Sequence, residues 1–350
     1  MCLRVSVSSS VQRCFTDVSV GALALPDGRA LTRVDDVCEF GMGLNAWHVV
    51  YEQLTPGRFE GGVEELWIDD GLEILRETGN RSVWTAGCNR LGMVSLGIPV
   101  AGGGAGMYCG VPIQDGAVSW LPGGGDFEIF SRERMDIVSA TVSESLLCAF
   151  AAIDSPQTME ASWRRPFLRQ QPRHAALLRR ALIEIVAAVR RQPGLLEVSA
   201  SRAAMRDCVL SLMLDTLSSA SARPTPDLRP SVKAWIVRKV REQALASPSE
   251  PLHVADVCRS LAVSRRSLQY AFEDLAGMGA VEFLRNVRLN AVRRELRVPV
   301  ACPDEPIAAI AARWGFWHMP RFAAYYRALF GERPSETRRR QGLSTLHGLG

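Results

Sequence analysis

Residues 254–277 read VADVCRSLAVSRRSLQYAFEDLAG, and residues 307–331 read IAAIAARWGFWHMPRFAAYYRALFG. Each segment has a short apolar stretch, a tight turn and a longer stretch whose apolar residues recur at helical spacing. Apolar positions 268, 272 and 275 in the first segment correspond to 322, 326 and 329 in the second. The pattern predicts two helix–turn–helix units, in which the second helix of each unit presents its N-terminal side chains to a partner.

A proline lies inside the second segment, at Pro320. In a helix interior it would cost about 3 kcal/mol. It is tolerated in the first turn, because the first N–H groups of a helix have no acceptor within the helix. We therefore expect a turn at 315–317 and a helix that begins near His318. In the first unit Ser264 is the expected N-cap, since its hydroxyl can accept from a free backbone N–H.

The segment between the two units predicts a rigid connecting helix and carries many arginines. Residues 281–297 read VEFLRNVRLNAVRRELR, with an apolar stripe that we expect to face inward. From Arg229 to the C-terminus there are 20 Lys and Arg against 11 Asp and Glu, whereas the preceding residues have 21 against 26. A basic C-terminal third on an acidic body indicates a nucleic-acid-binding module joined to another domain. A basic, solvated helix face is the alternative interpretation.

The bulk composition is that of a soluble globular protein. The chain has 350 residues, 47% of them hydrophobic and 22% charged, which suggests two or three domains. No signal peptide is expected, because the N-terminal residues are too polar. The uncharged residues 91–114 contain seven Gly and two Pro, so strands and turns explain them better than a membrane span. The nine Cys form no C-x-x-C pair, which favours reduced thiols in the cytoplasm.

The chain preceding the repeat predicts an α+β organisation. Short runs rich in Val, Ile and Trp alternate with Gly and Pro, as expected for a β-rich sandwich or barrel. We interpret WHVVYEQL (47–54) as a helical insert, and 173–192 and about 200–219 as helices. The predicted domains are a loose N-terminus (1–30), a β-rich sensor domain (31–150), a helical dimerisation segment (151–220), a linker (221–231) and an all-α double helix–turn–helix domain (232–342).

Three motifs resemble the AraC/XylS family of bacterial transcription regulators. They are SRRSLQYAFEDLAG, RLNAVRRELR and GFWHMPRFAAYYRALFGERPSE, and together they span about 100 residues. Upstream, NAWHVVYEQLTPGRFEGGVEELWIDDGLEILRETG is similar to the sensor half of the ethanolamine-operon regulator subgroup. The resemblance implies a cytoplasmic activator or repressor, with the activator favoured. It also implies a cupin-like sensor domain, a homodimer, and double-stranded DNA and RNA polymerase as partners.

The resemblance also assigns DNA contacts to the two second helices. The expected residues are Ser264, Arg265, Arg266, Ser267, Gln269, Tyr270, His318, Met319, Arg321 and Ala324. Arg suits bidentate contacts with guanine, and Gln suits adenine. The second helix is apolar at Met319, Pro320 and Ala324, so we expect it to contribute phosphate contacts and shape fit more than base readout. The candidates for phosphate contacts are Arg285, Arg288, Arg293, Arg294, Arg338 and Arg339.

The N-terminal half has candidates for a dimer seam and for an effector pocket. One apolar stripe either packs on its own domain or forms the seam, which the resemblance favours: Leu178, Leu182, Ile185 and Val189. Four tryptophans either line an apolar ligand pocket or pack in the core: Trp47, Trp67, Trp84 and Trp120. No cofactor is expected, and the small-molecule effector is not identified, since the Asp-x-His-x-x-Gly motif of cobalamin proteins is missing.

An enzyme is the rival class, and the sequence gives it little support. FGMGLNA (40–46) loosely matches a dinucleotide-binding loop, but the preceding VDDVCEF is too charged for a buried parallel strand. His48 is the single His in the first 170 residues, and no G-x-S-x-G or H-E-x-x-H motif occurs. We therefore expect no catalytic or metal-binding residues. The alternative is a β-barrel enzyme or small-molecule binding protein with an incidental basic tail.

Overall fold

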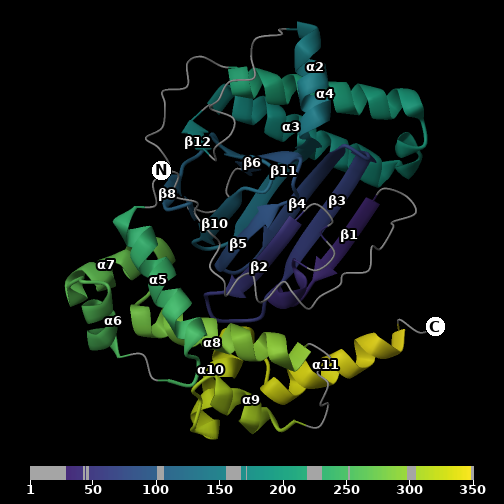
Figure 1. Ribbon diagram of the computed structural model, residues 1–350. Coiled ribbons are helices and arrows are strands. Elements are labelled where there is room, and N and C mark those ends of the chain that lie inside the picture. The colour runs from purple at the N-terminus through teal and green to yellow at the C-terminus, as the bar shows by residue number, and fades with distance from the viewer. Residues whose placement is uncertain are drawn as a thin grey trace.

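Two antiparallel sheets form the N-terminal half of the protein (Figure 1). The computed structural model describes residues 29–41, 44, 47–100, 106–154, 167–170, 172–218, 231–250, 253–297 and 305–347. The seven-stranded sheet has, in spatial order, β1 (Arg29–Val34), β3 (Gly61–Asp69), β4 (Leu72–Gly79), β11 (Met135–Ser143), β6 (Met93–Pro99), β9 (Ala117–Leu121) and β12 (Phe167–Gln170). The five-stranded sheet has β2 (Trp47–Gln53), β5 (Val83–Asn89), β10 (Asp126–Ser131), β7 (Gly106–Tyr108) and β8 (Val111–Ile113).

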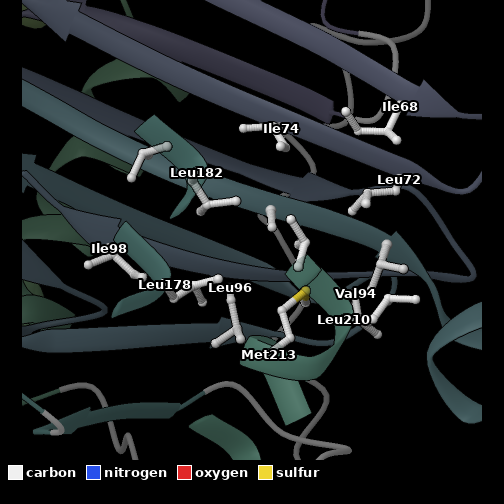
Figure 2. Close-up of a cluster of buried hydrophobic side chains, with 14 of the residues drawn as sticks. Ile68, Leu72, Ile74, Val94, Leu96, Ile98, Leu178, Leu182, Leu210 and Met213 are labelled. Atoms are coloured by element: carbon white, nitrogen blue, oxygen red, sulfur yellow. The ribbon is translucent and has the colours of Figure 1, made fainter. Parts of the chain in front are cut away.

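Helices cover the outer face of the seven-stranded sheet (Figure 1). They are α2 (Glu144–Asp154), α3 (Pro172–Arg191) and α4 (Ser199–Ser218), with a 3-10 turn, η3 (Pro193–Leu196), between the last two. Alternate strand residues such as Ile74 and Leu96 pack against Leu182 and Met213 of α3 and α4 (Figure 2). The two helices predicted here are confirmed, because an apolar stripe at helical spacing needs a flat apolar surface to cover it.

The strand-rich segment is confirmed, with one correction. The runs VEELWIDD, RSVWTAG, MVSLGIP, AVSWLPGG and FEIF correspond to β3, β5, β6, β9 and β10. WHVVYEQL, predicted as a helical insert, is instead strand β2, paired with β5 from Trp47↔Asn89 to Gln53↔Val83. Both faces of this strand are covered, so its apolar residues do not alternate cleanly with polar ones. Its paired residues lie 30 to 42 positions away in the sequence, from Gln53↔Val83 to Trp47↔Asn89, beyond any local pattern.

The C-terminal half is helical, as predicted (Figure 1). Its elements are α5 (Val232–Ala246), α6 (Val254–Ser260), α7 (Arg265–Ala276), α8 (Ala280–Arg297), α9 (Ile307–Arg313), α10 (Met319–Phe330) and α11 (Pro334–His347). Helices α6 and α7 form the first helix–turn–helix unit, and α9 and α10 form the second. Helix α8 lies between them, and its predicted inner stripe is buried: Phe283, Leu284, Val287, Ala291 and Leu296.

The five-stranded sheet lies between a cavity and the C-terminal helices. On one side, Trp84 and Phe130 belong to the same buried cluster as Phe272 and Phe283 of α7 and α8. On the other side, the space between the two sheets holds the cavity. Among the described residues, no helix combines the length and the apolarity that a membrane crossing requires. The predicted loose N-terminus, apart from residues 29–30, and the predicted linker, apart from Ser231, fall outside the described ranges.

Candidate nucleic-acid interface

The first unit is built as the sequence predicts. The Ser264 hydroxyl accepts a hydrogen bond from the Ser267 N–H at 3.0 Å, which caps α7 at its N-terminus. At the other end Gly277 adopts φ +68°, the left-handed conformation that ends many helices. The stripe of Leu268, Phe272 and Leu275 is buried. This leaves the N-terminal turns of α7 exposed and fixed in direction.

The predicted readers of the first unit lie together on that exposed surface. Arg265, Arg266, Ser267, Gln269 and Tyr270 are all exposed. The Arg266 guanidinium donates to the Tyr270 hydroxyl at 3.0 and 3.1 Å, and the Gln269 amide donates to the Glu273 carboxylate at 2.6 Å. These contacts hold the side chains near one another at little entropic cost. The surface offers guanidinium, amide and hydroxyl donors, the groups that recognise base edges in a major groove.

The second unit has the same skeleton with a different surface. His318 caps α10, its Nδ1 accepting from the Arg321 N–H at 3.2 Å, and Pro320 lies in the first turn as predicted. Of the predicted contact residues, His318, Arg321 and Ala324 are exposed, whereas Met319 is half-buried against the unit's own core. Trp317, in the turn, is 72% exposed. The tip of this unit is therefore mainly apolar, with Arg321 as its charged group.

The two turns use the same backbone conformation with different residues. Gly315 adopts φ +80° and Ala262 adopts φ +54°. Left-handed φ values suit glycine, and a residue with a Cβ atom pays roughly 1–2 kcal/mol to adopt them. The alanine in the first turn is thus held in place against its own preference by the helices on either side.

Two of the predicted phosphate contacts are engaged by the N-terminal half instead. Arg293 is buried and donates to both Asp36 carboxylate oxygens at 2.9 and 2.8 Å. Arg294 pairs with Glu52 at 3.1 Å. Both carboxylates belong to the N-terminal half, against which this side of α8 packs. The sequence showed that these arginines avoid the helix's inner stripe, but not that a second domain covers them.

The charges at this interface are matched, as the carboxyl groups show. Burial alone would raise the pKa of Asp36, but the positive charges and hydrogen bonds of Arg293, together with Arg297, bring it below its usual value. The same balance, with Arg241 and Arg294 as the cations, lowers the pKa of Glu52. Arg241 donates to Glu52 through two bonds of 2.7 and 3.1 Å. Buried carboxylates thus remain ionised because guanidinium groups accompany them.

Of the other four phosphate candidates, Arg339 is exposed and the rest are half-buried. Arg285 stacks 4.3 Å above the Tyr325 ring, and Arg288 donates to the Glu250 carbonyl at 2.6 Å. Burial lowers the pKa of Arg288. Arg338 donates to the Glu305 carbonyl at 2.7 Å, whereas Arg339 is exposed on the surface of α11. Of the six candidates, Arg339 is the one that the structure leaves most open to a phosphate.

Two asparagines of α8, which the sequence pattern did not single out, complete the contact with the N-terminal half. Asn290 accepts from the Gln53 N–H and donates to its carbonyl, both at 2.9 Å, and Asn286 donates to the Leu54 carbonyl at 2.8 Å. Both side chains are buried. A usable signal was present: two asparagines four residues apart on one helix face are costly to bury unless a polar partner meets them.

The cavity between the sheets contains one of the four predicted pocket tryptophans. Trp47 lines it, but the others lie elsewhere. Trp84 faces the C-terminal helices, with the Arg241 guanidinium 3.6 Å from its ring centroid. Trp120 is in the core beneath α3 and α4, and Trp67 donates to the Glu65 carboxylate at 3.0 Å. Those three do not line the cavity. Strand alternation turns Trp84 and Trp120 to the opposite faces of their sheets, because their neighbours Thr85 and Ser119 line it. Trp67 is on the inner face of β3, opposite Glu73 of β4, but is not among the residues that line the cavity.

The predicted dimer seam is also corrected. Leu178, Leu182 and Val189 are buried in the core between α3, α4 and the seven-stranded sheet, and Ile185 packs at its edge. Figure 2 shows Leu178 and Leu182 directed among the sheet side chains. The stripe therefore covers its own sheet and does not face a partner chain.

Comparison with known proteins places the C-terminal half among DNA-binding domains. Residues 257–340 match the family model described as "Helix-turn-helix domain". The chain is 35% identical over 133 residues to the probable thc operon regulatory protein of Rhodococcus erythropolis, covering 38% of this chain and 39% of that one. It is 43% identical over 77 residues to a XylDLEGF operon transcriptional activator of Pseudomonas putida, covering 22% and 24%. The matches thus span less than half the length of these relatives.

Solved structures give weaker likenesses. An AraC-type transcriptional regulator from Chromobacterium violaceum has 26% identity and a TM-score of 0.29, covering 32% of this chain and 96% of that one. ToxT from Vibrio cholerae O395 has 15% identity and a TM-score of 0.30, covering 83% and 96%. The family model and the curated relatives together show that residues 257–340 form a helix-turn-helix domain similar to those of AraC/XylS-type transcription regulators.

Proposed function

We propose that the protein is a sequence-specific DNA-binding transcription regulator of the AraC/XylS type. The observation that carries this proposal is the matched pair of units, α6–α7 and α9–α10, each with an exposed N-terminal surface on its second helix. One such unit could be part of an ordinary helical core. Two of them, held by the rigid helix α8, form a bidentate reader of duplex DNA.

The two recognition helices would enter successive major-groove segments on one face of the duplex, roughly 34 Å apart. Helix α7 would supply base contacts through Arg266, Ser267, Gln269 and Tyr270, with Ser264 and Arg265 beside them. Helix α10 would supply Arg321, His318, Met319 and Ala324, mostly to the backbone and to groove shape. The unequal chemistry of their surfaces supports this division.

The remaining assignments extend the same proposal. The protein would work in the cytoplasm, more as an activator than a repressor, contact RNA polymerase, and dimerise through its N-terminal half. Because the 178–189 stripe is covered, a dimer would use another surface. The N-terminal domain would sense a small molecule, and the resemblance of residues 45–79 to the ethanolamine-operon regulator subgroup supports this part of the proposal. The cavity between the sheets supports the sensing role.

Selection from a random duplex pool, longer than two helical turns, tests the DNA-binding function with the full chain. We expect an enriched sequence with two conserved blocks about one turn apart. Binding should weaken about 10³–10⁵-fold between 50 and 200 mM salt if 6–10 phosphates are contacted. Because Arg293 and Arg294 are engaged with the N-terminal half, we expect the lower end of that range. Failure to bind any duplex at 50 mM salt would favour a small-molecule binding protein with a basic tail.

A further inference from the structure

The cavity between the two sheets is lined mainly by apolar and aromatic side chains. Its volume is about 60 Å³, several times the roughly 10–15 Å³ that one water needs on this scale. Trp47, Tyr51, Tyr108 and Phe127 contribute aromatic groups to its wall, and Trp47 and Phe127 meet edge to face at 5.7 Å. Such a wall suits an apolar group of a few heavy atoms, since a cavity that binds benzene has a volume of about 150 Å³.

Three polar groups lie together in this wall. Tyr51 and Thr85 are directly opposed on β2 and β5, so their side chains lie side by side on the cavity face. The Tyr51 hydroxyl donates to the Glu77 carboxyl, which comes from β4 in the opposite sheet. The Thr85 hydroxyl is buried and has no hydrogen-bond partner. A buried polar atom left without a partner in a cavity wall indicates that something else satisfies it.

The ionisable groups of the site are acidic only. The lining residues include the Glu77 carboxyl but no Lys, Arg or His. Burial raises the pKa of Glu77 to about 7, although the Tyr51 hydrogen bond works in the opposite direction. Glu52, on the other face of β2, is fully buried and has two guanidinium partners, and its pKa is lowered. Glu77 thus lies where a carboxylate lacks the cation that it needs.

We propose that this cavity binds a small apolar amine, whose ammonium group pairs with the Glu77 carboxyl while its apolar part contacts Trp47 and Phe127. The ammonium would supply the missing cation, and the aromatic wall would add cation–π attraction. The Thr85 hydroxyl would accept one of the remaining ammonium protons. An anionic ligand would meet the carboxyl group of Glu77 with no positive side chain to offset it. The role of the amine as an effector rests on the proposed function, whereas its binding does not.

Calorimetric titration of the full chain with three matched probes of a size that fits the cavity tests the proposal: ethylamine, ethanol and acetate. Ethylamine should bind at least about tenfold more tightly than ethanol, because a charge-assisted hydrogen bond replaces a neutral one. Acetate should not bind. Equal affinity for ethylamine and ethanol, or the absence of binding by ethylamine, would overturn the proposal with the wild-type protein alone.

Two variants locate the site. Glu77→Gln should remove the preference for ethylamine over ethanol and leave the affinity for ethanol within a factor of about three, because the shape of the side chain is kept. Glu128→Gln is the matched control, since Glu128 is half-buried like Glu77 but lies on the face of β10 turned away from the cavity, where it accepts from Trp84. A preference that survives in Glu77→Gln would overturn the assignment of the cavity.

The same titrations distinguish this proposal from the proposed function. A chain that binds ethylamine through Glu77 but enriches no DNA sequence would retain the amine site and lose its role as a regulator. A chain that binds DNA but shows no amine preference would remain a DNA-binding protein, and the cavity would lose its ligand class.

Discussion

Helices α7 and α10 have equivalent buried residues but different exposed residues. With an offset of 54 residues, Leu275 corresponds to Leu329, and both are buried at the same depth of their units. With the same offset Arg266 corresponds to Pro320, and Tyr270 to Ala324, all at exposed positions. The comparison teaches that the core of such a unit fixes where the helix points, while the exposed turns decide what it can recognise.

The largest predicted losses of stability come from truncating a buried leucine, and they should be equal in the two helix–turn–helix units. Leu275→Ala and Leu329→Ala should each lower the free energy of unfolding by about 2–5 kcal/mol, since each removes a buried side chain and leaves a cavity. Urea unfolding of the two variants measures this. Ala323→Ser, at an exposed position of α10, serves as the control and should change stability by less than about 0.5 kcal/mol. A large loss for one leucine and none for the other would show that the two cores are not equivalent.

The next effects should separate the two reading surfaces. Arg266→Ala or Gln269→Ala should cost about 1–3 kcal/mol at one position of the selected sequence and relax the base preference there. Met319→Ala should weaken binding to all sequences by a similar factor, because an apolar side chain contributes fit more than base hydrogen bonds.

Competition binding against single-base variants of the selected sequence measures these effects. Arg180→Ala is the control: this exposed arginine lies on α3, beyond both sheets, and its loss should leave the base preference unchanged. If Met319→Ala relaxed one position as strongly as Arg266→Ala does, the division of labour between α7 and α10 would be wrong.

Exchanging glycine and alanine in the two turns should change the free energy of unfolding in opposite directions. Gly315→Ala should lower the free energy of unfolding by about 1–2 kcal/mol. Its Cβ would meet the Pro248 carbonyl at 3.1 Å and the Arg288 guanidinium at 3.2 Å, in addition to the unfavourable φ. Ala262→Gly should raise it by up to about 1 kcal/mol, because relief of strain exceeds the added chain entropy. Thermal unfolding measures both; a stabilising Gly315→Ala would contradict the account.

The smallest effects should come from the helix caps. Ser264→Ala should cost about 1 kcal/mol, and His318→Ala about half as much, since serine is among the favoured caps and histidine is not. Ser264→Asp, which keeps an acceptor, should restore most of the loss in urea unfolding. Equal costs at both positions would show that the His318 Nδ1 contact is as strong as a hydroxyl cap.

The parts of the fold that depend on local pattern could be predicted from the sequence. The caps, the turn before Pro320 and the buried stripes of α7 and α10 involve residues within four positions of one another. The assignment of β2 failed because only pairing with β5 distinguishes Trp47–Gln53 from an amphipathic helix. The assignment of Arg293 failed because its carboxylate partner, Asp36, lies 257 residues away. The helical period predicts which face of α8 Arg293 occupies, but it does not predict which residues pack against that face.

Ion pairs between the two halves of the chain neutralise arginines of the C-terminal half. The intact protein and an isolated C-terminal half would therefore present different net positive charge to DNA. Four arginines contact three carboxylates of the N-terminal half: Arg241, Arg293, Arg294 and Arg297, with Asp36, Glu39 and Glu52. A fragment that starts at Ser231 would lose these three carboxylates, although Arg293 would keep its ion pair with Glu332. For each of these guanidinium groups that contacts a phosphate, the slope of log binding constant against log salt concentration becomes more negative by about 0.9. Affinities measured on such a fragment would therefore overstate indiscriminate binding, because the intact molecule carries its own counterions.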